Sequence, residues 1–305
     1  MWFKNLTLFR FTEPFAGDAQ SLQAALERAV FRPCGSQDLQ THGWVAPLGG
    51  DEGALAHAVA GYLLVCLQTE DKLLPASVIR DAVDERVEEV EAREARKVRR
   101  KEKEAIKDAV LLELLPRAFV RRRRLYAYID TRGGWLVVNG TPGRAVDDFT
   151  SALRKVLGTL PIAPLRLVDA PAAVMTGWLA GTQALPAGFE LGDACELRDA
   201  GEEGGIVRCR GQDLAADEVR GHLEAGKQVT RVAVAWAQRL ACELADDLCV
   251  RRLRFLDLVQ EQLDDVAAET AAEEMDARFA LMTHEFAEFI PALLAAFGGE
   301  APAAA

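Results

Sequence analysis

The stretch PRAFVRRRRLYAYID, from Pro116 to Asp130, sets four consecutive arginines between a phenylalanine and a run in which apolar residues alternate with others. Alternation with a period of two is typical of a β-strand. The segment GWLVVNG follows after the turn-forming residues TRGG, so the two runs are expected to form a β-hairpin. The stretch therefore predicts an antiparallel sheet whose most basic part is the start of one strand.

A helical pattern precedes this stretch without interruption, from Pro75 to Pro116, and we expect one long helix there. Its apolar residues form one stripe, and a basic stripe lies about 140° away around the helix axis. The basic stripe consists of Arg93, Arg96, Arg100, Lys103 and Lys107. It is either a face for an anionic partner or a solvated face whose cations pair with nearby glutamates.

Strands and helices without regular βαβ alternation make up the rest of the chain, which predicts an α+β fold with antiparallel sheets and long helices. Trp2–Phe11 and Gly61–Glu70 are expected strands with a helix between them. In the second half, we expect strands at FELGDACEL and GGIVRCRGQDL and a helix at AADEVRGHLEAGK. We expect a long antiparallel pair formed by QVTRVAVAWAQRLACEL and CVRRLRFLD. An acidic helical pattern broken near Pro291 follows, and the tail GGEAPAAA is expected to be loose.

The chain has 305 residues, enough to bury about three quarters of its unfolded surface. We expect five parts: an N-terminal α/β part of a central region (residues 1–74), a long charged helical segment (75–116), a hairpin–helix part of the central region (117–165), a second α+β half (166–256) and an acidic C-terminal helical region (257–305).

Charge is distributed unevenly along the sequence. The formal net charge is −11, yet residues 93–124 hold 13 basic and 5 acidic side chains. Residues 255–305, in contrast, hold 11 acidic side chains and a single arginine. A molecule polarised in this way has one surface that attracts anions and another that repels them.

The six cysteines include no Cys-x-x-Cys pair, and the four histidines show no metal-ligand spacing. We therefore expect reduced thiols and no metal or other cofactor. No apolar run reaches the roughly 18 residues of a membrane-spanning helix. The N-terminal segment has no signal-peptide cleavage site, which favours a cytoplasmic protein.

Signatures of catalysis are weak in this sequence. No phosphate-binding loop, G-x-S-x-G turn or H-E-x-x-H motif occurs. Glu70, Asp71 and Lys72 resemble part of a magnesium-dependent nuclease site, but we expect them to form an ordinary turn. Cys34 and His42 are similarly expected to be structural rather than a nucleophile and its base.

Binding to a nucleic-acid backbone remains the function that the arginines favour. Lys and Arg side chains gain affinity for duplex DNA by releasing its counterions, whatever the base sequence. The sequence has no helix-turn-helix, zinc-finger or RNA-recognition pattern that would read bases. We therefore expect sequence-independent binding, confined to the basic surface by the acidic surplus elsewhere.

Several motifs together resemble one family over essentially the full chain. They are WFKNL at Trp2–Leu6, PCGSQD at Pro33–Asp38, LLPRAF at Leu114–Phe119, LGTLPIAPL at Leu157–Leu165, HLEAGKQVTRVAV at His222–Val234 and VRRLRF at Val250–Phe255. Their order and spacing resemble RdgC, a family of bacterial recombination-associated proteins.

The resemblance implies a cytoplasmic, nucleoid-associated protein whose elongated, curved subunits form a ring-shaped homodimer. Such a ring encircles double-stranded DNA without sequence preference, antagonises the RecA recombinase and so affects recombination and replication-fork repair. The family is expected to be neither enzymatic nor membrane-bound. By similarity, Phe119 closes the ring, and Gly211 with Gln212 forms a DNA-facing strand tip at which a lysine is expected in place of the glycine.

The residues expected to bind DNA are basic, apart from one glutamine at the strand tip. They are Arg96, Arg100, Lys103, Arg117, Arg121, Arg122, Arg123, Arg124, Arg208, Arg210 and Gln212. In an alternative interpretation Phe119 is a core residue and the arginines only solubilise a strand edge. Another alternative is a protein-interaction module that acts directly on a recombinase filament and has incidental DNA affinity.

Overall fold

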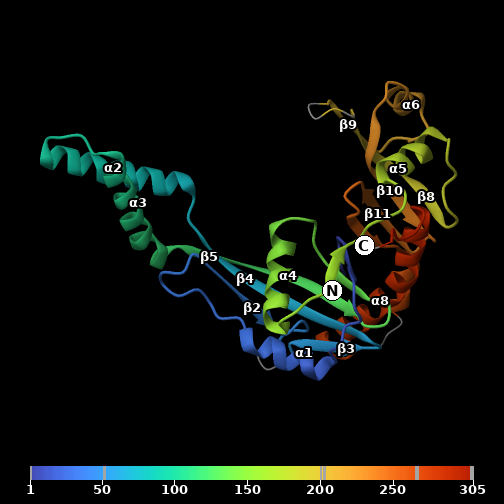
Figure 1. Cartoon of the computed structure of the whole chain (residues 1–305), viewed down its shortest axis with the longest axis horizontal. Helices are drawn as coiled ribbons and strands as arrows, with labels where there is room; N and C mark the ends of the chain where they lie inside the picture. Colours follow the sequence, from blue (N-terminus) through green and yellow to red (C-terminus); the bar gives the residue numbers. More distant parts are fainter. Residues whose placement is uncertain (1, 51–52, 200, 202–203, 265–267, 303–305) are drawn as a thin grey trace.

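The computed structural model describes residues 2–50, 53–199, 201, 204–264 and 268–302. The chain forms a curved body from which two arms extend on the same side, with an open space between them (Figure 1). One arm is a pair of helices, the base is a large sheet, and the other arm carries a second sheet. The predicted α+β class with antiparallel sheets is confirmed.

The base is a seven-stranded sheet with the order β2-β4-β5-β6-β1-β7, in which β3 also pairs with β4. Its strands are β1 (Thr7–Phe11), β2 (Gln40–Val45), β3 (Ala56–Val59), β4 (Tyr62–Leu73), β5 (Phe119–Asp130), β6 (Trp135–Val138) and β7 (Ile162–Pro164). The predicted β5–β6 hairpin is confirmed. Helices α1 (Ala19–Leu26) and α4 (Arg144–Leu157) pack their buried leucines into a core on one face of this sheet.

The second sheet has five strands in the order β12-β11-β10-β8-β9, with β9 at one edge. Its strands are β8 (Phe189–Arg198), β9 (Ile206–Arg210), β10 (Gln228–Trp236), β11 (Leu240–Ala245) and β12 (Val250–Phe255), accompanied by helices α5 (Pro171–Ala180) and α6 (Asp217–Glu224). The predicted long antiparallel pair is wrong, because it is a meander of three strands. Ala237 and Gln238 both adopt left-handed backbone conformations, which close a tight turn where the sequence has no glycine.

Helix α8 (Ala271–Ala296), preceded by α7 (Asp257–Asp264), joins the two sheets. Phe279 packs against Tyr128 of β5 with ring centroids 6.0 Å apart, and Phe289 packs against Trp236 of β10 at 5.5 Å. By length and composition α8 could cross a membrane, but these buried aromatic contacts account for its apolar character. The predicted break near Pro291 is wrong, since α8 continues through that residue.

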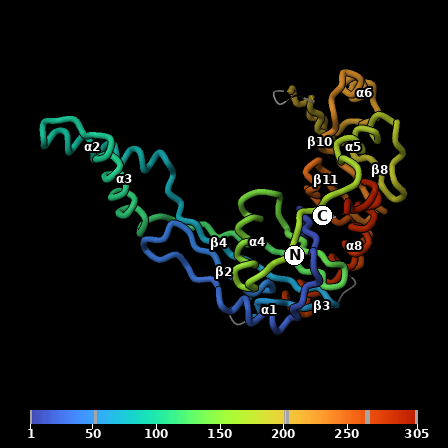
Figure 2. The backbone as a smooth tube through the Cα atoms, in the orientation of Figure 1, coloured from blue at the N-terminus to red at the C-terminus, as the bar shows by residue number. Residues whose placement is uncertain are grey.

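The C-terminal segment returns to the middle of the chain, near residues 166–168 (Figure 2). Val168 N–H donates to the carbonyl of Gly299 at 3.1 Å, and Ala301 N–H donates to that of Arg166 at 2.9 Å. The prediction of a loose tail is therefore wrong up to residue 302, while residues 303–305 of that tail lie outside the described part of the chain.

The helical arm consists of two helices, α2 (Ala76–Glu94) and α3 (Arg100–Leu114), followed by a 3-10 turn, Leu115–Arg117. The predicted single helix is wrong. Ala95 ends α2 in a left-handed conformation with φ 50°, and the chain then reverses. The reversal is held by Glu91, whose carboxylate accepts from Val98 N–H at 2.9 Å and from Lys97 Nζ at 2.6 Å.

Candidate nucleic-acid interface

The arginine run lies on the first half of β5, which pairs with β4 from Leu73 opposite Phe119 to Tyr62 opposite Asp130. The first six residues of β5 are exposed, whereas Ala127 and its two successors are buried. The basic half of the β4–β5 ribbon therefore extends beyond the core toward the helical arm (Figure 1).

Arg122 and Arg124 share one face of this ribbon, because side chains alternate along a strand. Arg122 Nε lies 2.6 Å from Oε2 of Glu70, and Arg124 Nε donates to Oε1 of Gln68 at 2.8 Å. The Glu70 side chain is 2% exposed and that of Arg122 is 57% exposed. A buried acceptor thus orients a guanidinium group that remains open to solvent.

Arg121 and Arg123 lie on the opposite face and share one carboxylate. Asp71 Oδ2 is 2.6 Å from Nη2 of Arg123 and 3.6 Å from Nη2 of Arg121. Both arginine side chains are more than half exposed. Because one aspartate neutralises two guanidinium groups only in part, this face keeps a surplus positive charge.

Glu70 has both carboxylate oxygens engaged. Its Oε1 accepts from the backbone N–H of Cys34 at 2.8 Å, while Oε2 accepts from Arg122. The Arg122 hydrogen bond and then that of Cys34 lower the pKa of Glu70. Within the residues that the structure describes, no group of three or more His, Cys, Asp or Glu side chains is placed to hold a metal.

The Cys34 thiol contacts the Thr41 hydroxyl at 3.4 Å and donates to the carbonyl of Glu70 at 3.3 Å. These contacts fix the loop before β2 against the end of β4. They support the structural interpretation of Cys34 and involve no imidazole.

The helical arm holds three of the predicted DNA-binding residues, and each has an acidic partner. The pairs are Arg96 with Glu94 and Glu102, Arg100 with Glu104, and Lys103 with Asp84. The predicted basic stripe is interrupted, because the turn at Ala95 separates Arg93 from the cations of α3. Arg117, at the end of the arm, is exposed and forms no ion pair with any described residue.

Strand β9 carries the predicted arginines of the second arm. Arg208 Nε lies 2.7 Å from Oε2 of Glu196, and this hydrogen bond lowers the pKa of Glu196. Arg210 is exposed and makes no ion pair within the described part of the chain. Gln212 follows β9, with its side chain exposed and its N–H donating to the carbonyl of Asp193 at 3.1 Å.

Gly211 separates Arg210 from Gln212 and adopts a left-handed conformation with φ +62°. A Cβ atom built at this position has no other atom within 4 Å. Glycine adopts this conformation freely, whereas other residues do so at a conformational cost. The lysine that the family resemblance implies would therefore have room here but a strained backbone.

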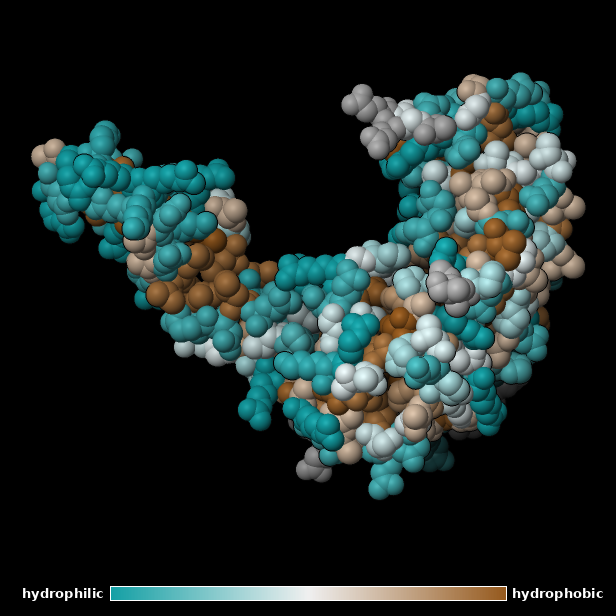
Figure 3. Space-filling view, in the orientation of Figure 1, coloured by the Kyte–Doolittle hydropathy of each residue, from teal (hydrophilic) through white to brown (hydrophobic). Residues whose placement is uncertain are grey.

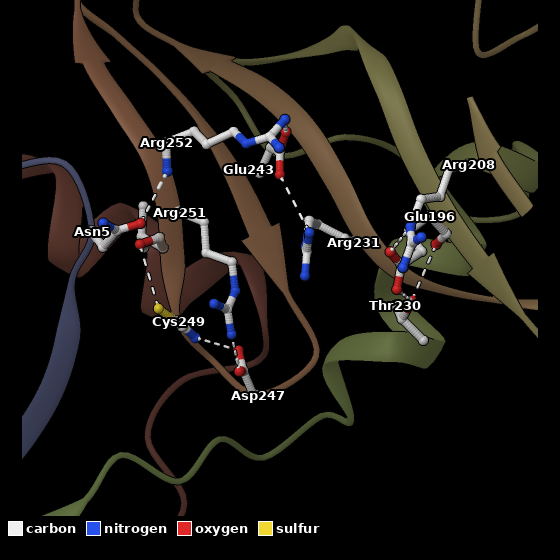
Figure 4. Close-up of polar contacts among 11 residues, drawn as sticks. Asn5, Glu196, Arg208, Thr230, Arg231, Glu243, Asp247, Cys249, Arg251 and Arg252 are labelled. Atoms are coloured by element: carbon white, nitrogen blue, oxygen red, sulfur yellow. Dashed lines mark hydrogen bonds and ion pairs between the residues drawn. The ribbon is translucent and has the colours of Figure 1, made fainter. Parts of the chain in front are cut away.

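Sequence analysis missed three further arginines, which lie on the open face of the five-stranded sheet. Arg252 Nη1 is 2.7 Å from Oε1 of Glu243, and Arg231 Nη1 is 3.8 Å from its Oε2 (Figure 4). Arg254 is exposed beside them. The alternation of arginine with buried leucine and phenylalanine at the end of VRRLRF was the signal that Arg252 and Arg254 share an outer face.

Small side chains lie between these arginines and form the floor of a hollow of about 360 Å³. Arg210, Arg252 and Arg254 are among its lining residues. The floor consists of Gly192, Ala194, Ala233, Ala235 and Ala241. The sheet therefore presents a shallow surface with a floor of small side chains, around which three arginines outnumber two carboxylates, Asp193 and Glu243.

An exposed apolar patch lies where β4 and β5 meet the helical arm (Figure 3). Phe119 is 84% exposed, so the interpretation of this residue as part of the core is wrong. Phe119 pairs with Leu73 on the neighbouring strand β4. The carbonyl of Leu39 accepts a hydrogen bond from the N–H of Lys72, which precedes Leu73. The apolar patch consists of Leu39, Leu73, Leu112, Phe119 and Val120.

Comparison with known proteins gives one consistent result. The family described as "Putative exonuclease, RdgC" matches residues 1–300. A protein of Tolumonas auensis named recombination-associated protein RdgC is 46% identical over 300 residues, which cover 98% of this chain and 99% of the relative. The protein of the same name from Pseudomonas fluorescens is 46% identical over 301 residues, covering 98% of both chains.

Proposed function

The chain belongs to the RdgC family, and on that premise we propose that it binds double-stranded DNA without sequence specificity, as a homodimer closed into a ring. In this proposal DNA passes through the space between the arms. Encirclement in the nucleoid then limits access of the RecA recombinase and modulates recombination and replication-fork repair.

The observation that carries the proposal is the placement of arginines on two surfaces of a curved subunit. The β4–β5 ribbon lies toward one arm, and β9 lies on the side of the second arm that is turned toward the first (Figure 1). Polar surface lines the space between them (Figure 3). Backbone contacts from two sides give affinity for a duplex of any sequence, because phosphates carry no base information.

The acidic partners of these arginines are compatible with DNA binding. An exposed ion pair contributes only about 0–1 kcal/mol, so a phosphate can replace or share the carboxylate at little cost. Arginine has five N–H donors, and the Nε contacts of Arg122 and Arg208 leave its terminal nitrogens available.

Ring closure is proposed to use the apolar patch that contains Phe119. An exposed phenylalanine beside Leu73, in a region that holds three other exposed apolar residues, is typical of an interaction site. We infer that its occupant is a second copy of the chain, since a two-fold symmetric contact buries the same patch on both subunits. Phe119 then provides an aromatic anchor at the contact between the subunits.

Binding to circular and linear duplex of the same length and sequence, across a salt series, tests the proposal. Encirclement predicts that circles stay bound after a high-salt wash while linear molecules slide off their ends. Initial affinity should fall with a log–log slope of about −0.9 for each neutralised phosphate. Equal loss of circles and linear molecules, or affinity that does not respond to salt, would contradict the proposal.

A second candidate function is direct interaction with a recombinase filament, with incidental DNA affinity. It is favoured by the helical arm, in which Arg96, Arg100 and Lys103 are each paired with a carboxylate. Replacement of Arg121–Arg124 by alanine distinguishes the two functions. Inhibition of the recombinase that survives the loss of DNA binding would favour the second candidate.

We propose binding rather than hydrolysis, although the family description contains the word exonuclease. The engaged oxygens of Glu70 support this choice, because a metal would have to displace both Arg122 and the Cys34 N–H. End-labelled duplex incubated with Mg²⁺ provides the test. Degradation that disappears in Glu70→Gln would overturn the choice.

A further inference from the structure

We propose that Cys195 and Cys209 form a reversible disulfide when hydrogen peroxide reaches the protein, joining β8 covalently to the edge strand β9. The two residues are direct partners in the antiparallel β8–β9 register. Both are free thiols in the structure. The proposal concerns thiol chemistry and does not depend on DNA binding.

The register places the two sulfurs on the same face of adjacent strands. Residues directly opposite each other in an antiparallel pair have Cα atoms about 4.5–5.5 Å apart. Disulfides join Cα atoms that are about 4.4–6.8 Å apart, so the backbone already has a suitable separation. Strand β9 pairs with β8 alone and can adjust its position, because its other edge is free of strands in the described part of the chain.

The other four cysteines have different neighbours. Cys66 lies opposite Tyr126 and Cys242 lies opposite Val234, both in the interior of a sheet. Cys249 is buried after β11, and the Cys34 thiol contacts oxygen atoms only. Cys195 and Cys209 are thus the one cysteine pair among the six that faces across a ladder.

The two thiols differ in accessibility, which sets the order of reaction. Cys209 is half-buried and lies on the edge strand β9, so an oxidant from solvent reaches it before Cys195. Cys195 is only 6% exposed, and burial followed by the adjacent Cys209 raises its pKa to about 12. Cys209 also lines a surface hollow together with Val219 and His222 of α6, so a small oxidant can approach it from solvent.

Peroxide supplies the oxidising equivalents for both steps. The Cys209 thiolate attacks one peroxide oxygen, the O–O bond breaks, and a sulfenic acid forms with release of hydroxide, which takes up a proton to become water. The Cys195 sulfur then attacks the sulfenic sulfur, the S–O bond breaks, and water leaves as the disulfide forms. Two thiols are oxidised by two electrons and one peroxide is reduced to two waters.

The disulfide would close a loop that contains the rest of the β8–β9 hairpin. An edge strand is otherwise held by one ladder only, so its backbone opens more readily than that of a central strand. We therefore expect amide exchange of Ile206–Arg210 to slow several-fold in the oxidised protein and to recover after dithiothreitol. The strand that carries Arg208 and Arg210 would become more rigid without any change in net charge.

The test is peroxide treatment of the full-length protein followed by non-reducing peptide mapping and thiol counting. We expect one intramolecular link between Cys195 and Cys209 and a fall from six free thiols to four. Cys195→Ala and Cys209→Ala should each abolish that link, whereas Cys34→Ala, which removes an unopposed thiol, should retain it. Wild-type protein that keeps six thiols, forms a different link or cross-links between molecules would overturn the proposal, whatever its DNA affinity.

Discussion

Nε of Arg122 lies 2.6 Å from Oε2 of Glu70, a carboxylate that is 2% exposed and holds a guanidinium group that is 57% exposed. The other Glu70 oxygen accepts the Cys34 N–H at 2.8 Å. One buried side chain therefore fixes a loop, a strand and an arginine at once. It also competes with phosphate for that arginine, so stability and DNA affinity are expected to change in opposite directions.

Glu70→Gln should separate these two roles. The amide oxygen can still accept the Cys34 N–H, but the charged contact with Arg122 is lost. We expect the free energy of unfolding to fall by about 1–2 kcal/mol. This value is at the low end for a hydrogen bond to a charged group, because Arg122 is half-exposed and solvent screens its charge. DNA affinity should rise a few-fold, with a salt slope steeper by up to about 0.9, because a phosphate no longer shares the charge of Arg122 with a carboxylate. Denaturant titration and fluorescence anisotropy measure the two effects, and a loss of affinity in a folded variant would contradict the assignment.

The pH dependence of this pair has a defined sign. The Arg122 hydrogen bond holds the pKa of Glu70 below its ordinary value of 4.5, so the ionised form stabilises the fold. That contribution is complete well above pH 4.5 and is lost as the pH falls through the lowered pKa. The stability difference between wild type and Glu70→Gln should therefore be constant near neutral pH and shrink under acid conditions. A difference that grows on acidification would refute this explanation.

Gly211→Lys should strengthen DNA binding at the strand tip. The position has a left-handed backbone and open space around it, so a lysine side chain can extend into solvent. Each added phosphate contact changes the log–log salt slope by about −0.9, and we expect a few-fold gain in affinity. Gly211→Ala is the matched control, since it introduces the same backbone penalty of about 1–2 kcal/mol without charge. Equal affinity of the lysine and alanine variants would place this tip away from DNA.

Periodic segments of the fold could be predicted from the sequence, and the interruptions could not. The β5–β6 hairpin follows directly from alternation and the TRGG turn. The reversal at Ala95 has no glycine or proline to mark it, because ion pairs and the Val98–Glu91 contact determine it. Pro291 shows the converse, since tertiary packing of α8 between two sheets outweighs the local preference of proline to end a helix.

The candidate site was predictable as a collection of arginines but not as an arrangement. The dense charge of β5 was visible in the sequence, whereas the acidic partners of Arg122 and Arg123 lie about 50 residues earlier and meet them only through strand register. Arg231, Arg252 and Arg254 were missed because they are spread over two strands, β10 and β12, and form no dense run like that of β5. Only the folded sheet places Arg252 and Arg254 around a hollow shared with Arg210, and Arg231 beside the Glu243 that also pairs with Arg252.

Arg210→Gln should weaken DNA binding more than Arg208→Gln does. Arg208 already shares its charge with Glu196, so it attracts a phosphate less strongly than Arg210, which has no acidic partner among the described residues. Free Glu196 would repel DNA, but Thr230 and Arg231 lie nearby to compensate part of that charge. We expect Arg210→Gln to make the salt slope shallower by about 0.9, with a smaller change for Arg208→Gln. Anisotropy titrations at several salt concentrations measure both, and the reverse order would indicate that Arg210 faces away from DNA.

Phe119→Ala should weaken association of two subunits without destabilising either one. The side chain is 84% exposed, so its removal leaves no cavity, and the free energy of unfolding should stay within about 0.5 kcal/mol of wild type. An aromatic anchor at an interface can contribute 2 kcal/mol or more, which corresponds to at least a 30-fold rise in the dimer dissociation constant.

Val168→Ala is the matched control, because Val168 is exposed and apolar but lies outside the patch. Analytical ultracentrifugation of both variants measures the constant, and retention on circular DNA should fall only for Phe119→Ala. An unchanged dimer constant together with unchanged retention would exclude this patch as the contact that closes the ring.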